Sequence, residues 1–186
     1  MASTADFRNG LVLEIDGQLY QMTYFQHVKP GKGGAFVRTK LKNIRTGLVL
    51  ERTFNAGERV TETRLDRRPI QFSYSDGHFY HFMDSNTFDD IMVTAEMVGD
   101  DQLKYLKEGM ACEGVLHNDT VIQVDLPSFV ELKVTRTDPG VRGDTATGGT
   151  KPATLETGAT VQVPLFIEEG QMIRVDRRED KYLTRV

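Results

Sequence analysis

The chain has 186 residues, of which 39% are hydrophobic, and its formal net charge is −4. No apolar run approaches the roughly 20 residues that span a bilayer, and the first residues lack the apolar core of a signal peptide. Cys112 is the single cysteine, so an internal disulfide is excluded and a small, partly buried core thiol is expected. These features predict a soluble, cytoplasmic protein that does not enter a membrane.

The net charge hides an asymmetry along the chain. Residues 1–65 hold 10 basic and 6 acidic residues (+4), residues 66–129 hold 4 and 12 (−8), and residues 130–186 hold 9 of each. Positive charge is therefore concentrated at the N-terminal end and negative charge in the middle. This distribution indicates that a polyanion would be met at selected places rather than over the whole surface.

Short strands joined by turns are expected in the first third of the chain. Leu11–Ile15 and Gln18–Val28 flank Asp16-Gly17, which is a hairpin turn signal. A second turn, at Arg45-Thr46-Gly47, precedes a further strand at Leu48–Phe54. Several strands within about 60 residues are typical of a small barrel.

A glycine-rich loop with a lysine at its tip follows Val28: Lys29, Pro30, Gly31, Lys32, Gly33, Gly34 and Ala35. Glycine on both sides of Lys32 removes Cβ atoms, so the backbone can approach a surface closely there. The loop matches neither the nucleotide P-loop nor the dinucleotide-binding glycine pattern. It is either a slender probe that carries one cation or an ordinary flexible turn with an incidental lysine.

The strand after this loop is predicted to carry a cationic stripe. Because side chains alternate along a strand, Arg38, Lys40 and Lys42 share one face, and the other face holds Val37, Thr39 and Leu41. The charges are then about 7 Å apart, which suits a phosphodiester backbone. No acidic residue lies between Gly17 and Leu50, whereas an ordinary surface mixes both signs. The alternative is a solvated strand face without a ligand.

A five-stranded barrel of the oligonucleotide/oligosaccharide-binding type is expected in the acidic middle. It would begin after a linker at Arg67-Arg68-Pro69 and continue with a hairpin turning at Asp76-Gly77. Phe88–Val93 is expected to form a helical turn or short helix, and Asp100–Leu106 another. A last hairpin would turn at Asn118-Asp119.

The last third begins with a strand at Phe129–Thr135 and continues with a long polar loop at Asp138–Pro152. A loop of this length in a small domain is usually functional or disordered. Two more strands are expected, at Thr160–Val163 and Met172–Val175. The sequence around residues 168–186 echoes that of the middle third, which indicates that the second and third units share a fold.

No constellation of catalytic or metal-binding residues is recognisable. His78 and His81 fall on opposite faces of a strand, so they do not form a metal pair. Adjacent acidic pairs such as Asp89-Asp90 are read as solvated surface because no partner base or nucleophile accompanies them. We therefore expect a protein that is not an enzyme, with no cofactor and no metal.

Three stretches make the chain resemble the bacterial elongation factor P family over its whole length. They are residues 29–38, the acidic middle with residues 80–84, and residues 137–153. The resemblance implies an all-β protein of three small barrels in an L-shaped, tRNA-like arrangement. The first would be a KOW/SH3-like domain at 1–65, and the others OB-fold domains at 66–128 and 129–186.

The resemblance also implies a function. A monomeric factor of this kind binds the 70S ribosome between the peptidyl and exit sites and contacts ribosomal RNA. It stimulates peptide-bond formation and relieves stalling at consecutive prolines by positioning the P-site peptidyl-tRNA. Lys32 matches the loop-tip residue that reaches toward the tRNA end, and in some members a lysine-modifying enzyme extends it.

Further residues follow from the same resemblance. Tyr182 and Arg185 match C-terminal RNA-contacting positions, beside the tRNA- and rRNA-binding stripe of Arg38, Lys40 and Lys42. The loop near the exit-site codon corresponds to Gly143, Asp144 and Thr145.

Two rival functions remain open. A general single-stranded RNA-binding protein of OB fold would need aromatic platforms beside basic residues in the second and third units. An enzyme that uses Lys32 as a nucleophile would need a desolvated lysine with a depressed pKa. An exposed glycine loop does not provide that desolvation.

Overall fold

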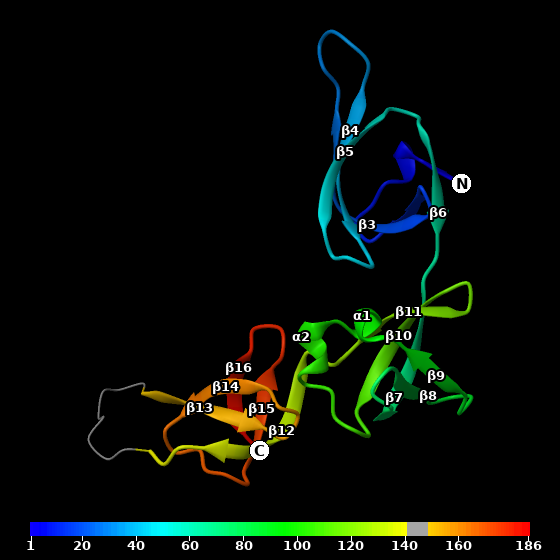
Figure 1. The fold of residues 1–186 in the computed structure, drawn as a ribbon. Helices are drawn as coiled ribbons and strands as arrows, with labels where there is room; N and C mark the ends of the chain where they lie inside the picture. The colour runs from blue at the N-terminus through cyan, green and yellow to red at the C-terminus, as the bar shows by residue number, and fades with distance from the viewer. Residues whose placement is uncertain (141–148) are drawn as a thin grey trace. The chain divides into compact units, whose positions relative to one another are not determined.

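The computed structural model describes residues 1–140 and 149–186, and strands dominate it (Figure 1). Contacts divide the chain into two compact units, one of residues 1–67 and 115–123 and the other of residues 68–114 and 124–186. In the described part of the chain, no helix is long and apolar enough to cross a membrane.

In chain order the elements are β1 (Ala2–Ser3), η1 (Thr4–Asp6), β2 (Val12–Ile15), β3 (Gln18–Val28), β4 (Phe36–Asn43), β5 (Val49–Asn55), β6 (Arg59–Thr63), β7 (Asp66–Ser75), β8 (Tyr80–Asp84), β9 (Asp90–Val93), α1 (Ala95–Val98), α2 (Asp100–Leu103), β10 (Ala111–His117), β11 (Thr120–Asp125), β12 (Phe129–Thr137), β13 (Thr150–Leu155), β14 (Thr160–Pro164), β15 (Met172–Asp176) and β16 (Lys181–Arg185).

The N-terminal sheet has the strand order β1-β6-β2-β3-β4-β5. Its predicted first hairpin is confirmed, since β2 and β3 pair up to Ile15↔Gln18. The two turn residues, Asp16 and Gly17, have φ of 52° and 74°, as a type I′ turn requires. The sheet curls around a core that includes Leu13, Met22, Val37, Leu41 and Phe54.

The turn between β4 and β5 is fixed by a buried asparagine. The Asn43 side-chain oxygen accepts hydrogen bonds from the backbone N–H groups of Arg45 (2.9 Å) and Thr46 (3.0 Å). Gly47 then takes a φ of 73°, which glycine adopts without strain. As a result β5 returns beside β4 in continuous antiparallel register, from Lys42↔Val49 to Phe36↔Asn55.

The central sheet has the order β11-β10-β7-β8-β9. The predicted linker, Arg67-Arg68-Pro69, lies where the two compact units divide, after Arg67, and it is already part of β7. There the Pro69 carbonyl accepts the backbone N–H of Ser85 at 3.0 Å. Proline fits an extended backbone wherever its missing N–H is not required by the ladder. The expected helix at Phe88–Val93 is wrong. Its residues 90–93 form β9, which pairs with β8, and the φ of 64° at Phe88 is incompatible with a helix.

The C-terminal part is a closed five-stranded barrel, β12-β13-β14-β16-β15, in which β14 and β16 run parallel. β13 and β16 escaped sequence analysis because β13 contains Lys151 and Pro152, and β16 is short and mostly polar. Both sheets share one strand order. The first strand pairs with the second and the fourth, the second with the third, and the fourth with the fifth. The barrel adds a pairing between the third and fifth strands, so the expectation of a shared fold is confirmed.

Within the second unit, polar contacts join the segment after α2 to the C-terminal barrel. Tyr105 is fully buried, and its hydroxyl donates to Asp180 Oδ1 at 2.5 Å. Lys104 Nζ lies 2.8 Å from the same carboxylate atom, and its carbonyl accepts from the Thr157 hydroxyl at 2.6 Å. Burial and the bond to Asp180 raise the pKa of Tyr105, while Lys104 and Tyr105 lower the pKa of Asp180.

Candidate nucleic-acid interface

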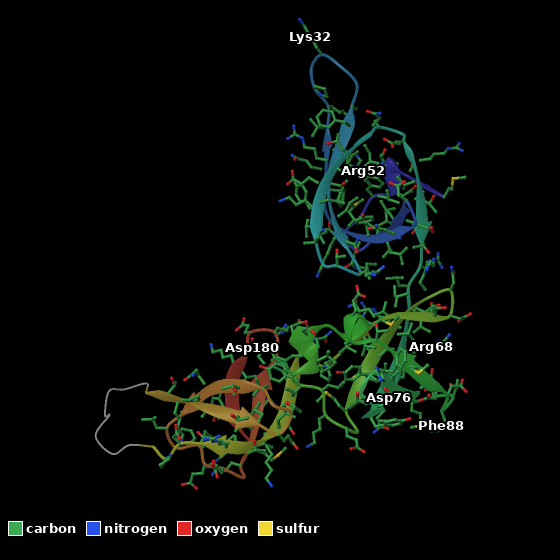
Figure 2. The ribbon with its side chains drawn as sticks, viewed as in Figure 1. Lys32, Arg52, Arg68, Asp76, Phe88 and Asp180 are labelled. Carbon is green, nitrogen blue, oxygen red and sulfur yellow. The ribbon has the colours of Figure 1, made fainter. Side chains whose placement is uncertain are left out.

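Lys32 is carried at the end of a projecting hairpin. The last pair between β3 and β4 is Val28↔Phe36, so residues 29–35 form the loop. Lys32 is exposed, and among the described residues no hydrogen bond or ion pair holds its ammonium group. Figure 2 shows its side chain directed away from the N-terminal sheet. An exposed lysine of this kind lacks the desolvation that a nucleophilic lysine needs.

The glycines of the loop differ in what they require. Gly33 has a φ of 118°, where an L side chain is strained, so glycine is needed there. Gly31 and Gly34 have no such φ, and a Cβ at either position would meet nothing within 4 Å. Their lack of a side chain keeps the loop thin but is not dictated by the fold.

The predicted alternation of β4 is confirmed. Val37, Thr39 and Leu41 are buried, whereas Arg38, Lys40 and Lys42 are exposed on the opposite face. The buried Thr39 hydroxyl donates to the Arg52 carbonyl at 2.8 Å, so its polar atom is satisfied. The cationic stripe is therefore a fixed feature of the sheet.

Cross-strand pairing places one carboxylate, that of Glu51, beside the stripe. Lys40 pairs with Glu51 of β5, and Lys40 Nζ lies 3.7 Å from Glu51 Oε1. In residues 1–140 and 149–186, no carboxylate lies within ion-pair distance of Arg38 or Lys42. Glu51 directly follows the segment that contains no acidic residue, and the sheet places it beside Lys40, at the centre of the stripe.

Aromatic rings lie beside these cations. Lys40 Nζ is 5.9 Å from the Tyr24 ring centroid, and the Arg38 guanidinium is 5.5 Å from that of Phe36. Sequence analysis missed these rings because it looked for aromatic platforms only in the second and third units. Tyr24 comes opposite Lys40 through the pairing of β3 with β4, after a register shift between Met22 and Tyr24 that the sequence does not reveal.

The two C-terminal candidates lie on β16. Tyr182 is half-buried and pairs with Val175, whereas Arg185 is exposed. The Arg185 guanidinium is 6.0 Å from the ring centroid of Phe166, which is itself 60% exposed. The structure thus adds Phe166 as an aromatic neighbour that the sequence had not suggested. Gly143, Asp144 and Thr145 lie outside the described residues.

The described residues flanking that loop are held to the barrel. Lys151 is buried, and its ammonium donates to the Asp138 carbonyl at 2.5 Å. A Cβ on Gly140 would lie 2.7 Å from the Leu165 carbonyl oxygen, so only glycine fits this close approach. These residues of the 137–153 stretch have structural roles in the barrel.

Several acids of the middle third also have structural roles. Asp84 is buried, and its carboxylate accepts the backbone N–H groups of Asn86 (2.8 Å) and Thr87 (3.0 Å), which lower its pKa. His81 is buried between two carboxylates, 2.8 Å from Asp76 and 3.4 Å from Asp90. Asp90 is therefore an ion-pair partner rather than plain solvated surface. No group of three or more potential metal ligands occurs in the described ranges.

The buried Cys112 agrees with its expected core role. Burial raises the pKa of its thiol to about 12, so it is not a reactive thiolate at neutral pH.

Family models match nearly the whole chain. The elongation factor P KOW-like domain matches residues 3–60, the elongation factor P OB domain residues 65–124, and the elongation factor P C-terminal domain residues 130–185. The chain belongs to the elongation factor P family. The KOW-like and OB assignments and the all-β fold class are thereby confirmed.

Elongation factor P relatives match from end to end. The protein of Pelotomaculum thermopropionicum is 54% identical over 186 residues, covering 100% of both chains. That of Rhodococcus erythropolis is 55% identical, covering 100% of this chain and 99% of the relative. The fold is also similar to that of eukaryotic translation initiation factor 5A from Methanococcus jannaschii. That structure has a TM-score of 0.53 and 21% identity, and the match covers 68% of this chain and 90% of that one.

Proposed function

We propose that the protein binds the ribosome between the peptidyl and exit sites and stimulates peptide-bond formation where consecutive prolines stall synthesis. Lys32 reaches toward the end of the peptidyl-tRNA, and the stripe of Arg38, Lys40 and Lys42 contacts RNA backbone. Tyr182 and Arg185 contact RNA from the C-terminal barrel, and Gly143, Asp144 and Thr145 lie near the exit-site codon. Membership of the elongation factor P family supports this function.

The observation that carries the proposal is that one hairpin has Lys32, exposed and without a partner among the described residues, at its tip and a cationic strand at its base. The strand supplies sequence-independent affinity for phosphates, and the thin loop allows Lys32 to reach the end of the peptidyl-tRNA. Holding the peptidyl-tRNA end in an attack geometry lowers the entropic part of the barrier. The ribosome forms the bond, and this protein provides no acid, base or nucleophile.

General binding of single-stranded RNA is the second candidate function. Rings beside cations at Tyr24–Lys40 and Phe36–Arg38 favour RNA contacts of this type. A general RNA-binding protein would not depend on Lys32, whereas the proposed factor does, so the loop separates the two.

The deciding experiment is translation of a reporter with a short proline run against a proline-free control. Lys32→Ala should leave the free energy of unfolding within about 0.5 kcal/mol, because an exposed loop residue packs little. Ribosome affinity should fall moderately, while rescue of the proline reporter falls much more, since the lost contact acts during the reaction. Gly34→Ala is the matched control in the same loop. Equal rescue by wild type and Lys32→Ala would favour the RNA-binding alternative.

Modification of Lys32 by a lysine-modifying enzyme is part of the proposal and has its own test. Lys32→Arg keeps the charge but not the ammonium geometry and blocks a lysine-specific extension. It should match Lys32→Ala if the lysine is extended and keep partial activity if it is bare. Intact mass of the native protein distinguishes the two cases directly.

A further inference from the structure

A hollow lies on the exposed side of β3, β4 and β5, below the lysine loop. The residues around it are Tyr24, Gln26, Arg38, Thr39, Lys40, Glu51, Arg52 and Thr53. Arg52 pairs with the buried Thr39, so the side chains of these two residues lie on the other face of the sheet. The basic side chains on the exposed face are Arg38 and Lys40 of the stripe. Tyr24 and Glu51 have no role so far.

One guanidinium group of the hollow is held by a ring and is free to donate. The Arg38 group lies 5.5 Å from the centroid of Phe36. It has no carboxylate partner within the described residues. A guanidinium stacked on a ring loses little freedom when it binds and keeps its N–H edge for a phosphate.

Tyr24 adds a flat surface at the edge of the hollow. Its ring is 44% exposed, and its hydroxyl donates to Gln26 Oε1 at 3.1 Å, which limits its rotation. An exposed aromatic ring beside cations stacks an unpaired base, whereas a base within a duplex is not available for stacking. The ring therefore favours a single-stranded ligand, which phosphate-binding lysines alone do not.

Glu51 is the one acidic residue of the hollow. Its carboxylate pairs with Lys40 at 3.7 Å, and both side chains are at least half exposed. An exposed pair of this length contributes little stability, so a phosphate can replace the carboxylate at low cost. Until that happens, Glu51 neutralises one cation of the hollow and repels RNA.

We propose that this hollow receives one unpaired RNA nucleotide, with its base against Tyr24 and its phosphate on the Arg38 guanidinium, while Glu51 releases Lys40 to the RNA. The inference rests on the proposed function in assuming that this face meets RNA. It goes further by naming a nucleotide subsite and a residue that restrains binding to RNA outside the proper partner.

The test is a titration of full-length protein with a labelled uridine hexanucleotide and, separately, with a short blunt RNA duplex, at several salt concentrations. Tyr24→Ala should weaken hexanucleotide binding roughly 5-fold or more and leave duplex binding unchanged. Tyr24→Phe keeps the ring and should bind the hexanucleotide like wild type. Both variants are checked by thermal melting, so that loss of fold is not mistaken for loss of the site.

Glu51→Gln should strengthen hexanucleotide binding and steepen the logarithmic salt dependence by up to about 0.7, the value for one more phosphate on a single strand. Glu14→Gln removes the same charge from β2, outside the hollow, and should leave the slope unchanged.

Equal effects of Tyr24→Ala on hexanucleotide and duplex, or no effect on either, would overturn the nucleotide site. So would the same slope for Glu51→Gln and Glu14→Gln. The proposed function fails differently, namely if replacing Arg38, Lys40 and Lys42 leaves ribosome binding intact. The two failures can therefore be told apart.

Discussion

The N-terminal face of β3–β5 and the second unit use their charged side chains in opposite ways. On the N-terminal face Arg38 and Lys42 have no carboxylate partner within the described residues, and Glu51 alone offsets Lys40. In the second unit charged groups engage one another, for example in His81–Asp76, Lys107–Glu156 (3.0 Å) and Arg178–Asp176 (2.8 Å).

The difference teaches that the number of charges in a segment is a poor guide to what they can bind. The middle third carries −8, yet several of its carboxylates hold backbone N–H groups or a histidine and are not free to meet a ligand. The first third carries only +4, but three of its cations lie in one row on β4, where Glu51 is the one carboxylate paired with them in the described residues. Unpaired charge on a rigid strand, rather than net charge, marks the candidate interface.

The largest expected effect comes from removing the unpaired charge. Replacing Arg38, Lys40 and Lys42 with glutamine should lower ribosome affinity by roughly 10- to 100-fold at low salt. It should flatten the logarithmic salt dependence by about 2–3, one phosphate contact for each cation. Affinity is measured by filter binding across a salt series. An unchanged slope would mean that the stripe is a solvated strand face.

A matched control uses cations that are already paired. Replacing Lys107 and Arg178 with glutamine removes two positive charges from the second unit, where each has a carboxylate partner. Ribosome affinity and its salt slope should change far less than in the stripe variant. Similar losses would show that net charge decides binding after all.

The next effect concerns stability within the second unit. Tyr105→Phe removes the buried hydroxyl that donates to Asp180 and should lower the free energy of unfolding by about 1.5–3 kcal/mol, the usual range for a bond to a charged group. Urea denaturation measures it. Tyr182→Phe, on the half-buried β16 tyrosine, is the control and should change stability little. Equal free energies of unfolding for Tyr105→Phe and wild type would mean that this hydrogen bond does not stabilise the second unit.

A smaller, pH-dependent effect is expected at His81. Its ring stacks on Tyr74 at 4.4 Å, and the hydrogen bonds that it donates to Asp76 and then to Asp90 raise its pKa above the usual 6.5. A raised pKa means that the contribution is complete below pH 6.5 and is lost as pH rises through the folded value. His81 also lowers the pKa of Asp76, so that contribution is lost when pH falls below the usual 3.8.

Thermal melting of wild type from pH 4 to pH 9 should therefore show a decline above about 6.5. His81→Gln should melt lower at pH 6 and lose that decline. A parallel decline in the variant would assign the pH dependence to other groups.

Much of the fold could be predicted because local signals agreed with it. The Asp16-Gly17 turn and the alternation of β4 each follow from a few neighbouring residues. β9 and β13 could not be predicted in this way. β9 is a strand because it pairs with β8, and β13 is a strand because it pairs with β12 and β14. None of these pairings can be predicted from the neighbouring residues alone.

The candidate site was predictable along each strand but not across strands. Lys32 and the stripe follow from the loop and from period-two alternation. Tyr24 joins them only through the register of β3 on β4, and Glu51 only through the register of β5 on β4, which the Asn43 turn fixes. The structural role of Asp84 was likewise hidden, because its partners are backbone N–H groups that a sequence does not reveal.

The smallest effect is expected from exposed acids of the middle third. Asp89, Asp100 and Asp101 are exposed, and none has a cationic partner in the described ranges. Replacing all three with asparagine should leave ribosome binding intact and raise affinity for non-specific RNA slightly, because repulsion of phosphate is reduced. Asp84 is left unchanged since its carboxylate holds the turn after β8. The measurement is hexanucleotide and ribosome binding at low and at physiological salt, where the small gain should fade as screening increases. Loss of RNA affinity in the triple variant would show that these carboxylates act through a bound cation. Exposed acids of the second unit would then contribute to RNA binding, as the unpaired cations of the N-terminal face do.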